Sequence, residues 1–124
     1  MDENFRKQLE ENGADVEGTL KRFMGNEALY MKFIMKFLDD KNFEGLESNL
    51  EKNDYEGAYV SAHTLKGVTA NLGLNPVYGV ATQISDLLKG KDPGEIDRGK
   101  LDALRDQLEA EHSRFVRLLE KYRP

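Results

Sequence analysis

Apolar positions along the chain recur at intervals of three and four residues, and no segment alternates strictly between apolar and polar residues over the length of a strand. This spacing is that of an amphipathic α-helix, so the chain is predicted to be all-α. Glycine, proline and Asn-Asp breaks divide the pattern into seven helices. We expect them from Phe5 to near Gly13, from Val16 to near Gly25, from an Asn26 cap to about Asp39, across Phe43–Leu50, from about Tyr55 to Leu72, from Asn75-Pro76 to Leu88, and across Leu101–Tyr122.

The last four helices follow one another through short connections, which favours antiparallel neighbours. We therefore expect residues 40–122 to form an up-down-up-down four-helix bundle, with residues 1–38 as additional short N-terminal helices of the same single domain, residues 1–124. In the helix that ends near Asp39, only Lys32 and Lys36 interrupt a run of apolar residues. This helix is predicted to pack on two sides, against the N-terminal helices and against the bundle.

Composition excludes several classes of function. The chain has no cysteine, which rules out thiolate nucleophiles, disulfides, cysteine-ligated zinc and iron–sulfur clusters. Its 18 basic residues are scattered among 23 acidic ones, and the net charge of −5 disfavours a nucleic-acid partner. No apolar run approaches the roughly 18 residues of a membrane span, and the N-terminus lacks the features of a signal peptide. We predict a cytoplasmic protein with no membrane partner.

One of the two histidines is a candidate for chemistry. On a helical wheel His63 lies nearly opposite Leu65 and Leu72 and should face solvent. Sharing its face are Tyr59, Lys66, Gly67, Ala70 and Leu74. A glycine inside an exposed helix costs about 1 kcal/mol relative to alanine, so Gly67 calls for a reason other than helix formation. A neutral exposed imidazole is a competent nucleophile toward phosphorus, and a lysine three residues away attracts a phosphoryl group.

The other histidine, His112, lies on the apolar stripe of the last helix and is predicted to be structural, partly buried with a satisfied ring nitrogen. Glu109 and His112 have the Glu-x-x-His spacing of di-iron bundles. Such sites need a second copy on another helix, and Val60 stands three residues before His63. No metal site is therefore predicted.

The segment Ala62–Leu74, AHTLKGVTANLGL, resembles the signature of histidine-containing phosphotransfer domains, A-H-x-L-K-G followed after a short gap by an apolar residue and glycine. The resemblance covers roughly residues 26–122. It implies that His63 is phosphorylated on Nε2, that Lys66 contacts the phosphoryl oxygens and that Gly67 admits the partner. We expect Thr64, Ala70 and Asn71 to join Gly67 in partner binding.

The same resemblance implies a function in two-component phosphorelays. Such domains pass phosphoryl groups between aspartates of receiver domains, in response regulators and in hybrid sensor histidine kinases. They have no kinase or ATPase activity and no cofactor of their own, and magnesium is expected on the partner receiver domain. A single copy of the motif and the lack of an outward leucine seam favour a monomer.

The sequence departs from the family pattern at one position. Many relatives have Gln or Glu 22 residues after the histidine, where it orients the ring, and this chain has Ser85 there, beside Thr82 on the flank of the next helix. The ring could be oriented instead by Thr82, by Ser85 or by a bridging water. The alternative is that nothing orients it and the ring is more mobile.

Two other classes of function compete with the phosphorelay. A purely structural helical adaptor would be expected to lose His63 or Lys66, and both are present. A helical metal-oxidase or hydrolase needs converging ligands or a nucleophile–base pair, and the two histidines lie on separate helices without a carboxylate triad.

Overall fold

The computed structural model describes residues 1–124 and contains helices and no strand, which confirms the all-α prediction. The α-helices are α1 (Glu3–Glu11), α2 (Val16–Arg22), α3 (Glu27–Lys36), α4 (Asn42–Glu51), α5 (Tyr55–Leu72), α6 (Asn75–Leu88) and α7 (Arg98–Lys121). Short 3-10 turns follow α3 (Phe37–Asp39) and precede α7 (Pro93–Glu95). The bounds of α5 are those that the sequence predicts.

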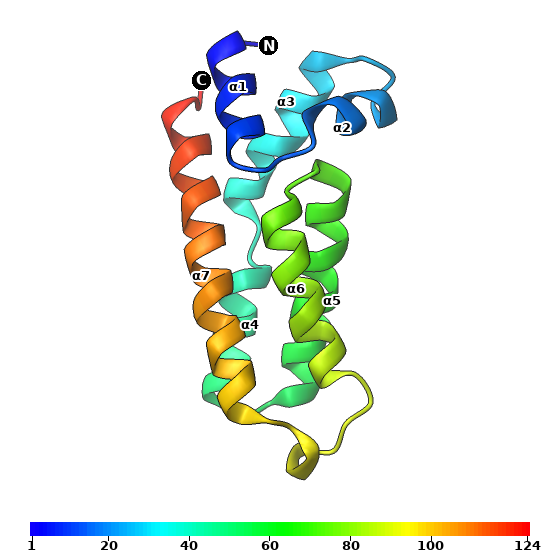
Figure 1. Ribbon diagram of the computed structural model, residues 1–124, viewed down its shortest axis with the longest axis vertical. Coiled ribbons are helices and arrows are strands. Elements are labelled where there is room, and N and C mark those ends of the chain that lie inside the picture. The colour runs from blue at the N-terminus through cyan, green and yellow to red at the C-terminus, as the bar shows by residue number, and fades with distance from the viewer.

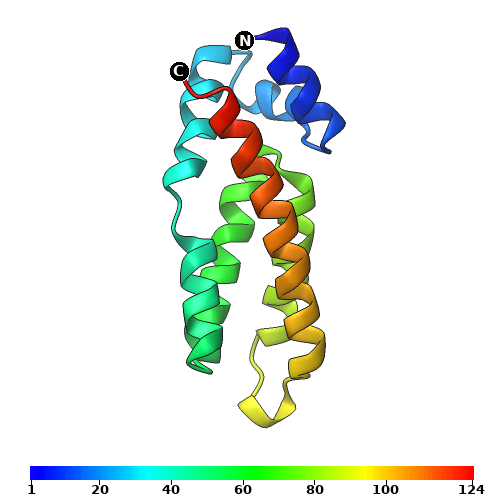
Figure 2. The ribbon, with the colours of Figure 1, turned by 90° about the vertical axis from the view of Figure 1, so that its left-hand side faces the viewer.

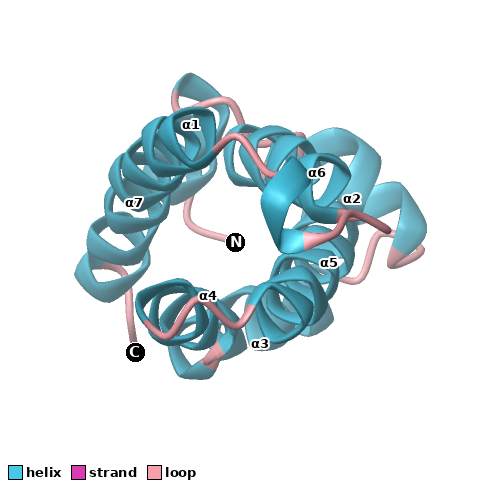
Figure 3. Cartoon of the chain, turned by 90° about the horizontal axis from the view of Figure 1, so that it is seen from below, coloured by secondary structure: helices cyan, strands magenta, loops and turns pink.

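Helices α4 to α7 lie side by side along the long axis and alternate in direction as the chain is followed (Figure 1). Helices α1 to α3 gather at one end, with α3 above α4 and α1 beside the last turns of α7 (Figures 1 and 2). The view along the long axis shows the helices arranged around a common interior (Figure 3). One cluster of 26 buried apolar residues fills it, with members from all seven helices.

Side-chain caps explain where most helices begin. Asp2, Asp15, Asn26, Asp54 and Asp97 each accept a hydrogen bond from the backbone N–H three residues on. Such caps satisfy one of the free N–H groups of the first turn. The caps predicted at Asn26 and in the Asn53-Asp54 break are confirmed.

Helix α6 begins differently from the prediction. Its N-cap is Leu74, without a side-chain hydrogen bond, while Asn75 is already helical and Pro76 occupies the first turn. Leu74 is fully buried, whereas the wheel places it on the exposed face of His63. The reason is the left-handed turn at Gly73, with φ of 71°, which ends α5 and redirects the chain before Leu74.

Helix α3 packs less symmetrically than its sequence predicts. Tyr30 and Ile34 are fully buried, but Phe33 is 38% exposed. The last predicted turn is 3-10, because the backbone tightens at Phe37 before turning into α4. No helix has the length and apolar character needed to cross a bilayer.

Candidate functional site

Helix α5 is held at both ends by local signals. Asp54 caps its first turn through the N–H of Gly57 at 2.9 Å. At the other end, the carbonyl of Gly73 accepts a hydrogen bond of 2.8 Å from the N–H of Asp15. A Cβ on Gly73 would lie 2.7 Å from the carbonyl oxygen of Asp15, so this position needs glycine for space as well as for φ. The end of α5 is therefore tied to the start of α2.

His63 lies in the middle of α5 and is exposed, as its wheel position predicts. Its ring stacks on that of Tyr59, one turn earlier, with centroids 5.7 Å apart and planes inclined by 22°. No protein group is hydrogen-bonded to the imidazole, so both ring nitrogens are open to solvent or a partner. Tyr59 shares the predicted face, but its contact with the ring was not foreseen.

The nearest predicted cation, Lys66, is half-buried on the next turn. No ion pair of the protein involves its ammonium group, which is free to attract an anion. A lysine three residues from a histidine shares its helix face. The pair therefore combines a nucleophilic ring with an unpaired positive charge.

Beside His63 the surface of α5 carries only small side chains, or none. A Cβ built on Gly67 meets no atom within 4 Å, and Ala70 is exposed with only a methyl group. Exposed Thr64 donates its hydroxyl proton to the carbonyl of Val60 at 2.8 Å, and Asn71 is exposed near the end of the helix. All four residues predicted to bind a partner lie on the accessible surface of α5.

The two residues predicted to orient the imidazole do not contact it by hydrogen bonds. The Thr82 hydroxyl donates to the carbonyl of Tyr78 at 2.8 Å. Ser85 is only 2% exposed, so its small side chain lies inside the packed bundle. The ring contact that His63 does make is with Tyr59.

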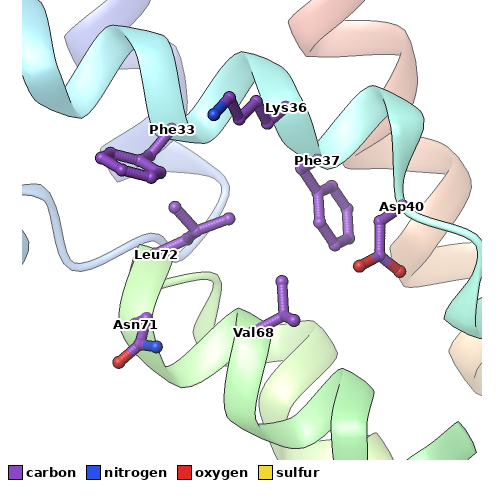
Figure 4. A pocket seen from close by; sticks show the side chains of 7 residues that line it. All are labelled: Phe33, Lys36, Phe37, Asp40, Val68, Asn71 and Leu72. Atoms are coloured by element: carbon purple, nitrogen blue, oxygen red, sulfur yellow. The ribbon is translucent and has the colours of Figure 1, made fainter.

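Sequence reasoning missed a groove of about 240 Å³ between α3 and α5 (Figure 4). Its lining residues are Phe33, Lys36, Phe37, Asp40, Val68, Asn71 and Leu72. The available signal was that Phe33 shares a helix face with Lys36, one of the two polar residues that interrupt this apolar helix. The partner helix of that phenylalanine is set by tertiary packing, which local periodicity does not encode.

His112 is partly buried, as predicted, but its ring is held by aromatic contacts instead of a hydrogen bond. It stacks on Phe43 with centroids 4.4 Å apart and lies 5.4 Å from the ring of Phe37. Burial lowers the pKa of His112, an effect that the negative charges of Asp40 and Glu44 oppose. The structure contains no group of three or more His, Asp or Glu side chains placed to hold a metal ion.

Comparison with known proteins places this geometry in a family. The family model of the Hpt domain matches residues 38–114. This segment is more than half of the chain and includes His63, Lys66 and Gly67. No curated protein and no solved structure gives a match. Hpt domains are phosphotransfer carriers rather than kinases. The chain belongs to the Hpt domain family, whose members carry out histidine phosphotransfer in two-component signalling.

Proposed function

We propose that His63 accepts a phosphoryl group from the aspartate of one receiver domain and passes it to the aspartate of another. The observation that carries this proposal is the exposed imidazole beside an unpaired Lys66 and the open surface at Gly67. The other histidine, His112, is packed against two phenylalanine rings and offers no comparable access.

The proposed step is an in-line transfer between two nucleophiles. The Nε2 lone pair of neutral His63 attacks phosphorus, the P–O bond to the receiver aspartate breaks, and the aspartate leaves as a carboxylate. The proton on Nδ1 stays on the ring, so phosphohistidine forms without a base. In the return step the carboxylate of a second receiver attacks phosphorus and Nε2 leaves with the bonding electrons.

Lys66 supports both steps electrostatically. Lys66 stands three residues after His63 on α5 and its ammonium group has no carboxylate partner, so it is available to donate to phosphoryl oxygens. A charge-assisted hydrogen bond of this kind stabilises its complex by roughly 1.5–3 kcal/mol. Tyr59 restrains the ring plane by stacking, the role for which Thr82 and Ser85 were candidates.

The partners we propose are receiver domains of response regulators and of hybrid sensor histidine kinases. Each would bring its own magnesium ion, and the open surface around Gly67 and Ala70 leaves room for the receiver loops that surround the aspartate. We propose that the protein acts as a cytoplasmic monomer and contributes no kinase or ATPase activity of its own.

Transfer from a receiver domain phosphorylated with ³²P tests the proposal. The protein should acquire an acid-labile, alkali-stable label that His63→Gln abolishes and His112→Gln, the matched control, retains. Because His63 is exposed and outside the core, the substitution should leave helical content unchanged by circular dichroism. Label that persists in His63→Gln would refute the assignment, and an unlabelled parent protein would favour a purely structural adaptor.

A further inference from the structure

Tyr59 and Lys66 flank His63 on the same side of α5. Successive residues of an α-helix are about 100° apart, which places Tyr59 about 40° and Lys66 about 60° from His63 in the same direction around the helix. Val60 lies about 60° from His63 in the opposite direction. The imidazole that stacks on Tyr59 is therefore drawn toward the side of Lys66 and away from Val60.

The turn before His63 offers the imidazole two places to lie. Side chains of a helix lean toward its N-terminus, so the ring covers the turn that contains residues 59 and 60. Val60 is 58% exposed and has no ring to stack on, whereas Tyr59 is half-buried and packs against the core cluster. The imidazole lies at Tyr59, with ring centroids 5.7 Å apart, a separation typical of aromatic pairs.

The stack contacts a face of the imidazole and leaves its edge free. The two ring planes are inclined by 22°, and no hydrogen bond of the protein involves either ring nitrogen. A hydrogen bond to Nε2 would have to break when that atom takes up a phosphoryl group, whereas a contact with the ring face persists. Tyr59 is thus able to hold the ring in the same place before and after phosphorylation.

We propose that Tyr59 is a positioning residue for phosphotransfer, whose ring holds the imidazole of His63 on the Lys66 side of α5 so that a phosphoryl group on Nε2 is within reach of the Lys66 ammonium group. The inference rests on the proposed phosphotransfer at His63 and names how that site is aligned. Tyr59 does not touch the phosphoryl group and acts only through the other two residues.

The number of ring positions sets the size of the effect. An α-helix disfavours one of the three χ1 wells, and the imidazole has a roughly two-fold χ2, so about four orientations are open to His63 without the stack. A ring that samples all four is productive for about a quarter of the time when one of them faces Lys66. Loss of the stack should therefore slow labelling of His63 by about two- to fourfold.

The test is a double-mutant cycle between Tyr59→Leu and Lys66→Ala, with phosphoramidate as the donor. The P–N bond of this donor breaks with loss of ammonia as the His63 Nε2–P bond forms, and so small a molecule needs no docked protein. Tyr59→Leu should slow labelling by about two- to fourfold in the parent background and have no effect in the Lys66→Ala background. Tyr59→Phe keeps the ring and should label at the parent rate.

Tyr122→Leu is the matched control, because it removes another half-buried tyrosine, one that packs on Phe5 with centroids 4.9 Å apart and lies outside α5. This variant should label at the parent rate even where its Tm is lower. Circular dichroism should show unchanged helical content in every variant.

A further variant moves the aromatic ring to the other side of His63. Val60 is exposed, so Val60→Tyr combined with Tyr59→Leu should fold and draw the imidazole away from Lys66. Labelling should then fall by about a further twofold or more below that of Tyr59→Leu alone. Three-bond NMR couplings that report χ1 of His63 should show one dominant rotamer in the parent, averaged rotamers in Tyr59→Leu and a different dominant rotamer in the combined variant.

Four results would overturn the inference. An equal loss from Tyr59→Leu in both backgrounds shows that Tyr59 does not act through Lys66. A parent rate in Tyr59→Leu, or a slow Tyr59→Phe, shows that the aromatic ring is not what matters. Equal slowing in Tyr122→Leu assigns the loss to stability. Failure of the proposed function is distinct, because a phosphorylated receiver then leaves the parent protein unlabelled, whatever the outcome of the cycle.

Discussion

Replacing Gly67 by alanine and by glutamine separates the stability of α5 from access to His63. A Cβ at Gly67 meets nothing within 4 Å, so neither side chain clashes inside the protein. Alanine removes the entropic cost of glycine in a helix and should stabilise the fold by about 0.5–1 kcal/mol, with glutamine slightly less. For 124 residues, an unfolding entropy of about 2.1 cal/mol/K per residue converts this gain into a rise in Tm of about 2–4 °C.

Phosphotransfer should change in the opposite direction. The reacting atoms must come within about 3–3.5 Å of each other, and a displacement of about 1 Å is enough to cost up to a hundredfold in rate. A methyl group at Gly67 projects little beyond the helix, so we expect a few-fold loss for alanine. Glutamine extends several ångströms into the space beside His63 that the receiver must enter, so we expect a loss of about tenfold or more.

The assay is the transfer rate from one phosphorylated receiver, measured with thermal unfolding of the same samples. Gly79 on α6 is the matched control, because a Cβ there also meets nothing within 4 Å. Its alanine and glutamine variants should gain similar stability and transfer at the parent rate. The reasoning is refuted if Gly67→Gln transfers normally, or if Gly67→Ala destabilises the protein.

Three further predictions concern charge. Lys66→Ala should slow transfer and shorten the lifetime of the phosphohistidine by about tenfold, measured by decay of the label; an unchanged lifetime would leave Lys66 a surface lysine. Arg22→Gln should lower Tm by about 4 °C, because it removes about 1 kcal/mol of hydrogen bonds to carbonyls at the end of α5. The control Lys21→Gln should leave Tm unchanged, and equal shifts in the two variants would contradict this reasoning. Since burial lowers the pKa of His112 below 6.5, the unfolded chain takes up a proton more readily, and the free energy of unfolding should fall as the pH drops from 7 to 5. This pH dependence should be weaker in His112→Gln, and an unchanged dependence would rule out His112 as its source.

Features that are decided by residues close together in the sequence were predictable. Asp54 and Gly73 are strong start and stop signals, and α5 has the predicted limits Tyr55–Leu72. The exposure of His63 follows from the same helix, since its period holds over the whole segment. The wheel failed at Leu74 because Gly73 interrupts the helical period one residue earlier.

Features that depend on how helices meet were not predictable from periodicity. The burial of Ser85 depends on how α6 packs against its neighbouring helices, and Ser85 differs little from Thr82 in local pattern. Phe33 and Val68 line the same groove, although 35 positions separate them in the chain. Contacts of this kind are decided by the whole fold.

The 24-residue helix α7 is about 36 Å long and lies beside the other helices of the bundle and beside the N-terminal helix α1. Near its end the hydroxyl of Tyr122 accepts a hydrogen bond from Gln8 at 2.7 Å, and Arg114 donates to the carbonyl of Asn12 at 3.1 Å. Unfolding either the N-terminal helices or the rest of the bundle would thus expose one side of α7. The chain should unfold as one cooperative unit, in which amide hydrogens of α1 and of the middle of α7 exchange with solvent through a common opening event.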